Sequence, residues 1–160
     1  MIKVFLSHQR ADAGKAGEIA ARLKVYHQID SYLDVIDPFL GRPGTDLAAH
    51  IRSEMSKCTQ LLAVVSSATP NSQWVPWEIG VASEKDYPLA TFSNYASLVP
   101  EFLRSWPYLT SMVDVDAYAL ASKKAENERV VKEYRTTASA ARRETTGSFF
   151  GDLRARLGQR

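Results

Sequence analysis

The sequence has little of what several common classes of protein require. Among its 160 residues is one cysteine, Cys58, so no disulfide can form within the chain, and this is compatible with a reducing compartment. No apolar run approaches the ~20 residues of a membrane-spanning helix. The amino terminus begins a strand at once, without the apolar segment of a signal peptide. Together these absences predict a soluble, cytoplasmic protein.

An excess of charge of either sign is missing too. Twenty Lys and Arg residues against 18 Asp and Glu give a formal net charge of +2, which is far from the polycation typical of nucleic-acid-binding proteins. Apolar residues make up 45% and charged residues 24% of the chain, as in an ordinary globular domain with a substantial core. We therefore expect neither a nucleic acid nor a membrane as partner.

The motifs of several common ligand sites are absent. The sequence has no GxxxxGK[ST] phosphate loop, and no GxGxxG follows its first apolar run. The histidines His8, His27 and His50 have no zinc-ligand spacing with each other or with Cys58. Ser7 and His8 are neighbours on an expected strand, so their side chains point in opposite directions, which argues against a catalytic triad. We expect no metal and no bound cofactor.

Short apolar runs alternate with helical patterns over the first 115 residues. Strands are predicted at Ile2–Leu6, Ser31–Val35, Gln60–Ser67, Leu89–Phe92 and Ser111–Val115. Helices are predicted to begin near Asp12, at the N-cap Thr45 and at Pro76, with a short one around Leu98–Arg104. This alternation predicts an α/β domain with a central parallel sheet of about five strands flanked by helices.

The last part of the chain has a different pattern. From about Ala117 to Glu144 the residues favour a helix with a weak apolar face, which Thr145-Thr-Gly147 is expected to end. A short amphipathic turn, Phe149 to Leu157, follows. We expect residues 1–116 to form the α/β domain and residues 117–160 to form a helical extension packed on that domain.

One stretch, Ser72 to Ala82, places a single acid between aromatic residues. Pro76 suits the first helical position, which makes Glu78 the third and leaves Trp74 just outside the helix. A capping box would need Ser or Thr where the sequence has Val75. Glu78 either gains about 0.3–1 kcal/mol from the helix dipole or has a chemical function.

A single carboxylate suffices for cleaving a glycosidic bond that is already activated. In nicotinamide nucleotides the leaving group is a cationic pyridinium, which departs without protonation. A fixed carboxylate can stabilise the oxocarbenium-like ribose that develops, and the usual second carboxylate becomes unnecessary. Glu78 is a candidate for such a group.

Three segments together resemble the conserved boxes of a Toll/interleukin-1 receptor (TIR) domain. They are Lys3–His8, the Pro- and Gly-rich loop from Ile36 to Gly44, and Ser72–Trp74 with Glu78 four residues after the Trp. The resemblance covers roughly residues 2–115, and the boxes occur in the order of the family. It implies a flavodoxin-like parallel sheet.

The resemblance also implies an activity and a set of site residues. Many bacterial TIR domains cleave NAD, as a substrate, at the nicotinamide–ribose bond and release ADP-ribose or a cyclic isomer. Glu78 matches the catalytic position of that family. The matching substrate-binding residues are Ser7, His8, Gln9, Arg10, Asp37, Phe39, Leu40 and Trp74. Pro76 and Trp77 depart from the usual box, which is often polar or cationic there, and would reshape the nicotinamide pocket.

A solitary TIR domain is similar to the signal-producing component of Thoeris antiphage defence, whose nucleotide product activates a separate effector protein. TIR-like enzymes complete their site between subunits, so the resemblance implies a homo-oligomer in which Phe39, Leu40 and Arg42 of one chain approach Trp74 and Glu78 of another. The alternative is a non-catalytic module for TIR–TIR interaction, or an effector that mimics host TIR domains.

Overall fold

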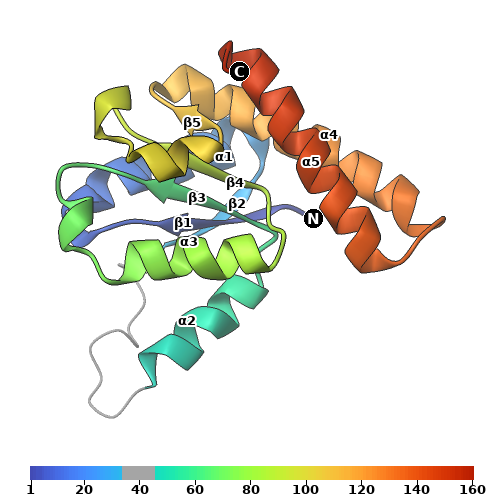
Figure 1. Ribbon diagram of the computed structural model, residues 1–160, viewed down its shortest axis with the longest axis horizontal. Coiled ribbons are helices and arrows are strands. Elements are labelled where there is room, and N and C mark those ends of the chain that lie inside the picture. Colours follow the sequence, from blue (N-terminus) through green and yellow to red (C-terminus); the bar gives the residue numbers. More distant parts are fainter. Residues whose placement is uncertain (34–45) are drawn as a thin grey trace.

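The fold is built on a five-stranded parallel sheet. The computed structural model describes residues 1–33 and 46–160. The strands are β1 (Lys3–Ser7), β2 (Asp30–Leu33), β3 (Gln60–Val64), β4 (Leu89–Phe92) and β5 (Tyr108–Leu109), in the spatial order β2-β1-β3-β4-β5 (Figure 1). This is the doubly wound order of flavodoxin-like folds. The predicted fold class is confirmed.

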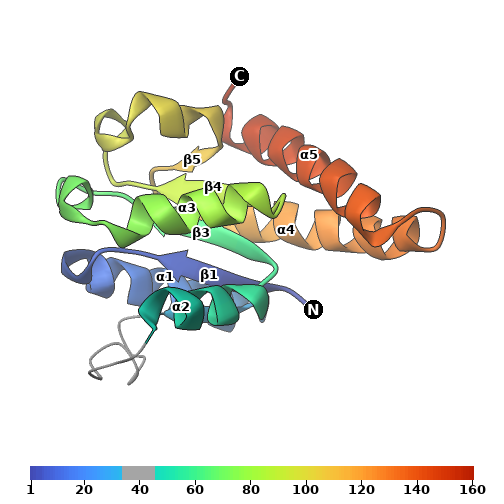
Figure 2. The same cartoon turned by 60° about the horizontal axis from the view of Figure 1, so that its bottom comes forward.

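Helices cover both faces of the sheet. They are α1 (Ala13–His27), α2 (Leu47–Ser56), α3 (Trp74–Glu84), α4 (Met112–Glu133) and α5 (Ala138–Leu157), with the 3₁₀ helices η1 (Arg10–Asp12), η4 (Thr69–Asn71), η5 (Ala96–Leu98) and η6 (Glu101–Ser105). Helices α2 and α3 pack on one face and α1 and α4 on the other, while α5 lies along α4 (Figures 1 and 2). No helix in the described part of the chain is long and apolar enough to span a membrane.

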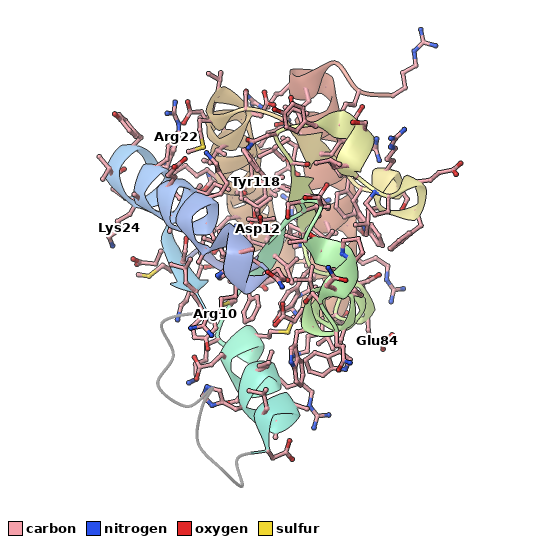
Figure 3. The ribbon with its side chains drawn as sticks, turned by 90° about the vertical axis from the view of Figure 1, so that its left-hand side faces the viewer. Arg10, Asp12, Arg22, Lys24, Glu84 and Tyr118 are labelled. Carbon is pink, nitrogen blue, oxygen red and sulfur yellow. The ribbon has the colours of Figure 1, made fainter. Side chains whose placement is uncertain are left out.

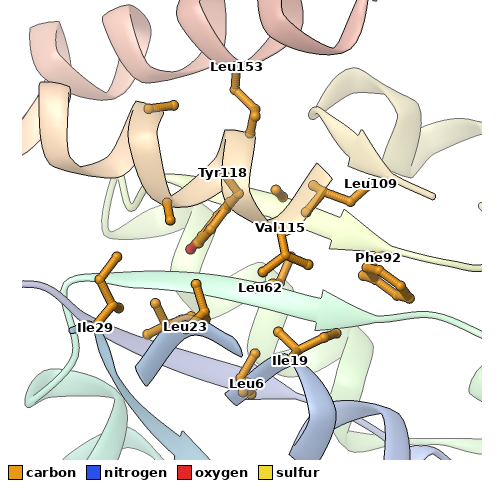
Figure 4. Close-up of a cluster of buried hydrophobic side chains, with 14 of the residues drawn as sticks. Leu6, Ile19, Leu23, Ile29, Leu62, Phe92, Leu109, Val115, Tyr118 and Leu153 are labelled. Atoms are coloured by element: carbon orange, nitrogen blue, oxygen red, sulfur yellow. The ribbon is translucent and has the colours of Figure 1, made fainter. Parts of the chain in front are cut away.

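The central strands are buried on both faces, which explains their consecutive apolar residues. In β1, Val4 and Leu6 belong to the cluster under α1 and α4, which Figure 4 shows. Phe5 belongs to the cluster under α2 and α3. Because side chains alternate along a strand, Ser7 faces the same side as Phe5. The last residue of β1 is thereby directed toward α3.

The fifth strand and the helix after it differ from the prediction. Ser111 was expected to begin a strand, but it is the N-cap of α4 and forms a capping box with Asp114. Its hydroxyl accepts from the Asp114 N–H at 3.3 Å, and the Asp114 carboxylate accepts from the Ser111 N–H at 3.0 Å. The strand ends earlier, at Leu109. The S-x-x-D signature of a capping box was present in the sequence and outweighs the β propensity of Val113 and Val115.

The C-terminal helices also differ from the prediction. Helix α5 continues through Thr145-Thr-Gly147, where a break was expected, and the interruption lies between Glu133 and Ala138 instead. Thr145 and Thr146 are buried, and Phe149, one turn later, is fully buried. Burial of these side chains outweighs the roughly 1 kcal/mol by which a glycine disfavours a helix.

Helix α2 begins one residue later than predicted. Asp46, not Thr45, is the N-cap of α2, and its carboxylate accepts from the Ala49 N–H at 2.9 Å. Cys58 follows α2 instead of lying within it, and it is buried as expected. Burial raises the pKa of the Cys58 thiol to about 11, so the residue acts as a small hydrophobic group and not as a reactive thiolate.

Candidate active site

The candidate site lies where the chain leaves β1 and β3 at the same edge of the sheet. These strands are neighbours, with Ser7 beside Ala63. After β1 the chain crosses to α1 on one face, and after β3 it crosses to α3 on the other. Ligands of open α/β sheets bind at such a topological switch point, outside the carboxyl ends of the strands. Figure 3 views the molecule from this edge, with Arg10 and Asp12 labelled after β1.

A short hydrogen bond joins β1 to α3 at this point. The Ser7 hydroxyl donates to Oε2 of Glu78 at 2.5 Å, and both residues are fully buried. A buried carboxylate is costly unless it is hydrogen-bonded. The neighbour of Ser7 on β3 is the small Ala63. The hydrogen bond between Ser7 and Glu78 fixes an acid at the carboxyl end of the first strand.

The start of α3 differs from the prediction. Trp74 is the first helical residue, so Pro76 is the third and Glu78 the fifth. The Ser72 hydroxyl accepts from the Val75 N–H at 3.2 Å and satisfies one free donor. Pro76 remains within the first turn, where a missing N–H costs nothing. Glu78 lies beyond the residues that the helix dipole stabilises, and it is fully buried and accepts the Ser7 hydrogen bond.

Trp74 lies one helical turn before Glu78. Residues four apart share a face of a helix, and Trp74 remains 37% exposed while Glu78 is fully buried. The Trp74 ring meets the Trp77 ring edge-on, at 5.5 Å between centroids. Trp77 packs against the core. Trp77 thus supports a partly exposed indole next to the buried acid.

The polar residues after β1 have distinct local contacts. Nδ1 of the buried His8 lies 2.8 Å from the carbonyl oxygen of Leu6. A carbonyl only accepts, so Nδ1 carries the hydrogen and Nε2 is the basic nitrogen of the neutral ring. The Gln9 side chain accepts from the Ala11 N–H at 2.7 Å and caps η1. Arg10 is exposed.

A second polar contact joins the loops after β1 and β3. The Ser66 hydroxyl donates to the Asp12 carboxylate at 2.8 Å, and the Ser66 N–H donates to the Thr69 hydroxyl at 2.8 Å. Asp12 occupies the predicted N-cap position of α1, yet its side chain makes no capping bond. Sequence reasoning missed this pair because the two residues are neighbours only once β1 and β3 lie side by side.

Comparison with known families decides what kind of domain carries this site. Residues 4–132 match the family described as TIR domain. The chain belongs to the TIR domain family. The match includes the whole site described above and ends within α4, so α5 lies outside it.

The TIR domains of the structure entitled "Structure of the activated Roq1 resistosome directly recognizing the pathogen effector XopQ" are similar to this TIR domain. They are 17% identical in sequence, with a TM-score of 0.48 over 99% of this chain and 98% of that one. No curated protein matches the chain.

The structure places the predicted site residues of this TIR domain as follows. It brings Ser7 into contact with Glu78 and places Trp74 one turn from the acid. His8, Gln9 and Arg10 continue the chain from Ser7 at the same edge. Asp37, Phe39 and Leu40 lie outside the described residues. Within residues 1–33 and 46–160, no three His, Cys, Asp or Glu side chains gather as a metal site.

Proposed function

We propose that this TIR domain cleaves NAD at the nicotinamide–ribose bond, with Glu78 as the catalytic carboxylate. The observation that carries the proposal is the buried Glu78, held by the Ser7 hydroxyl at the topological switch point of the sheet. This position is where ligands of open α/β sheets bind, at the carboxyl ends of the strands, and a buried acid there is a candidate catalytic group.

The chemistry needs one acid and no proton donor. The bond between C1 of the ribose and the pyridinium nitrogen breaks, and its electron pair leaves with neutral nicotinamide. The ribose carbon becomes oxocarbenium-like, and the Glu78 carboxylate stabilises its positive charge. Capture of that carbon by water, with loss of a proton, yields ADP-ribose. Capture by a nucleophile of the same nucleotide, with loss of a proton, yields a cyclic ADP-ribose, which has one water less than ADP-ribose.

The neighbouring residues have separate proposed roles toward NAD. Trp74 offers an indole face to the cationic pyridinium, an attraction of about 0.5–2 kcal/mol. Arg10 supplies a positive charge for the diphosphate. Ser7, His8 and Gln9 line the substrate, and Asp37, Phe39 and Leu40 complete the substrate-binding set. NAD is the substrate, and no further cofactor is required.

In this proposal the product is a cyclic ADP-ribose-type signal, or ADP-ribose, made in the cytoplasm. The signal activates a separate effector protein in antiphage defence of the Thoeris type. The proposed role of Glu78 does not depend on which product forms, because both products follow the same cleavage step. A product analysis by mass spectrometry separates hydrolysis from cyclisation.

Assembly is proposed to complete the site. In a head-to-tail contact, which uses two different patches, Phe39, Leu40 and Arg42 of one TIR domain would approach Trp74 and Glu78 of a second. Specific activity then rises with protein concentration. Mixing a Glu78→Gln chain with an Arg42→Ala chain, each inactive alone, restores activity if the site is shared. No recovery in mixed assemblies that are shown to form would mean that each chain works alone.

The direct test is incubation of the protein with NAD and measurement of free nicotinamide. Glu78→Gln removes the charge and keeps the shape, so we expect a folded variant that has lost nearly all turnover. Glu84→Gln is the matched control, because Glu84 is exposed on the same helix. Turnover near wild type in folded Glu78→Gln would contradict the assignment of Glu78 as the catalytic carboxylate. No nicotinamide from the assembled wild-type protein favours the non-catalytic TIR–TIR interaction module.

A further inference from the structure

A cavity of about 140 Å³ lies at the end of the sheet opposite the candidate active site. It is lined by the residues at the beginning of β3, including Thr59 and Gln60, and by residues of α4 and α5. Figure 1 shows the amino terminus, α4 and α5 together at this end. Helix α5 lies outside the residues that match the TIR family, so this cavity depends on an element that the family match does not include.

The hydroxyl groups in the cavity wall are already used as donors. Each lies 2.8–3.2 Å from a protein oxygen that accepts its hydrogen: the Thr59 hydroxyl from Lys3, Ser122 from Gln60 or Tyr118, Thr145 from Ala141, and Thr146 from Asp86. The Thr59 hydroxyl also accepts from the Lys3 N–H at 3.1 Å, which leaves it one lone pair. A hydroxyl has one hydrogen and two lone pairs, so what each has left is acceptor capacity. The wall therefore favours a ligand that brings hydrogens of its own, as hydroxyl or amino groups do.

The two arginines of the cavity wall differ in their charge balance. Arg129 is paired with Glu126 at 2.9 Å and also with Glu133. Arg142 lies 5.6 Å from the centre of the Tyr87 ring and, within the described part of the chain, has no ion pair. Lys85 lies 5.8 Å from the same ring centre and is likewise without an ion pair there. Two cations without an ion pair in the described residues thus lie around the Tyr87 ring, and one of them, Arg142, lines the cavity.

The volume limits how much of a ligand the cavity can surround. An enclosed protein cavity of ~150 Å³ can hold a molecule as large as benzene, so about 140 Å³ surrounds roughly six heavy atoms. The cavity is partly open to solvent, so the anionic group of a larger ligand can lie outside it, beside the exposed Arg142. Glu126 in the wall repels an acid group from its own side, while Arg142 attracts one. A ligand would therefore direct its anionic group toward Arg142 and its hydroxyl or amino hydrogens toward the wall oxygens.

We propose that this cavity, bordered by α5, binds a small anion that also carries hydroxyl or amino groups, with Arg142 contacting its carboxylate or phosphate. The site goes beyond NAD cleavage and is independent of Glu78. It makes α5 a ligand-binding addition to the TIR domain. The site lies at the amino-terminal ends of the strands, and the proposed catalytic residues lie at the carboxyl ends.

The test uses two polyhydroxy acids on the full chain, each with a hydroxyl-bearing part of roughly six heavy atoms or fewer for the cavity to surround. Glycerol 3-phosphate and glycerate are titrated at constant ionic strength and followed by calorimetry, with methyl phosphate and propionate as partners that lack hydroxyl groups. We expect saturable one-to-one binding of glycerol 3-phosphate or glycerate, at least roughly tenfold tighter than the matching hydroxyl-free acid. Which of the two binds identifies phosphate or carboxylate as the anionic group.

Variants locate the binding. Arg142→Ala should weaken it roughly tenfold or more, because a charge-assisted bond is lost. Arg143→Ala is the matched control, since Arg143 is on the same helix but paired with Asp86 at 3.4 Å and outside the cavity. Ala125→Leu, which fills the cavity, should abolish binding. Thr145→Val is a milder second variant, because that hydroxyl donates to carbonyl oxygens of its own helix, and it should weaken binding.

Three results would overturn the proposal. The first is the absence of saturable binding of both polyhydroxy acids to folded wild-type protein. The second is equal affinity in Arg142→Ala and Arg143→Ala, each shown to be folded by circular dichroism. The third is equal affinity for hydroxyl-free and polyhydroxy acids, which would mean that surface charge alone attracts the anion.

Discussion

The Ser7 hydroxyl donates a 2.5 Å hydrogen bond to Oε2 of Glu78 across the contact between β1 and α3. The two residues are 71 positions apart in sequence, and both side chains are fully buried. A hydroxyl donor stabilises the charge of a carboxylate and restricts its rotation. Ser7 is therefore placed to position the acid, in addition to its proposed place in the substrate pocket.

Loss of this bond should affect the chemical step. We expect Ser7→Ala to lower kcat for NAD cleavage roughly 10- to 100-fold with little change in KM, because the acid acts on the transition state. Ser7→Thr keeps the hydroxyl and should recover much of kcat. Steady-state kinetics on the folded variants measures the split. An effect confined to KM, with no recovery in Ser7→Thr, would instead make Ser7 a simple substrate contact.

Trp74 should act on binding more than on chemistry. Trp74→Ala removes the indole face proposed for the pyridinium and should raise KM for NAD roughly 3- to 30-fold, with Trp74→Phe intermediate. Tyr134→Ala removes another exposed aromatic residue, beyond the end of α4, and serves as control. Equal KM values in Trp74→Ala and in the control would exclude this role.

Stability should depend on pH through Asp116. The Arg22 guanidinium, through two hydrogen bonds of 2.9 and 2.6 Å, and then His27 lower the pKa of Asp116 from 3.8 to about 2. A carboxyl with a lowered folded-state pKa stabilises the fold above its unfolded pKa, and that contribution is lost as pH falls from about 4 to about 2. Because the group is partly exposed, we expect about 1 kcal/mol in the free energy of unfolding.

Denaturant unfolding of Asp116→Asn checks this expectation. The variant should be less stable than wild type at pH 7, and the difference should vanish toward pH 2. Asp30→Asn is the control, since its pair with Lys24 is more exposed and contributes little. A stability difference for Asp116→Asn that is as large at pH 2 as at pH 7 would contradict the electrostatic explanation.

Helix α5 should be part of the folding unit. Phe149 is fully buried, and its ring meets that of Tyr118 edge-on at 5.6 Å between centroids. We expect Phe149→Ala to lower the free energy of unfolding by about 3–5 kcal/mol in one cooperative transition. Leu120→Ala, at an exposed position of α4, should change it little. Near-native stability of Phe149→Ala would show that α5 contributes little to the core.

The sequence by itself determined the class of fold and singled out Glu78 as the candidate acid. Runs such as Leu61–Val65 show no alternation because parallel strands are covered on both faces, and helical patterns between them imply crossovers. The spacing of Trp74 and Glu78 is a local property of one helix. These features depend on a few neighbouring residues, so a linear pattern reveals them.

Tertiary structure decided where the elements begin and end and which distant side chains meet. Ser72, outside α3, supplies a hydroxyl that lets the helix start before Pro76. Buried Thr146 bonds to the carbonyl oxygen of Asp86 at 2.8 Å, and α5 continues past Gly147. The contact of Ser7 with Glu78 exists because β1 and β3 are adjacent in the sheet and α3 packs over them. Such contacts depend on packing between segments far apart in the chain, which local propensity does not contain.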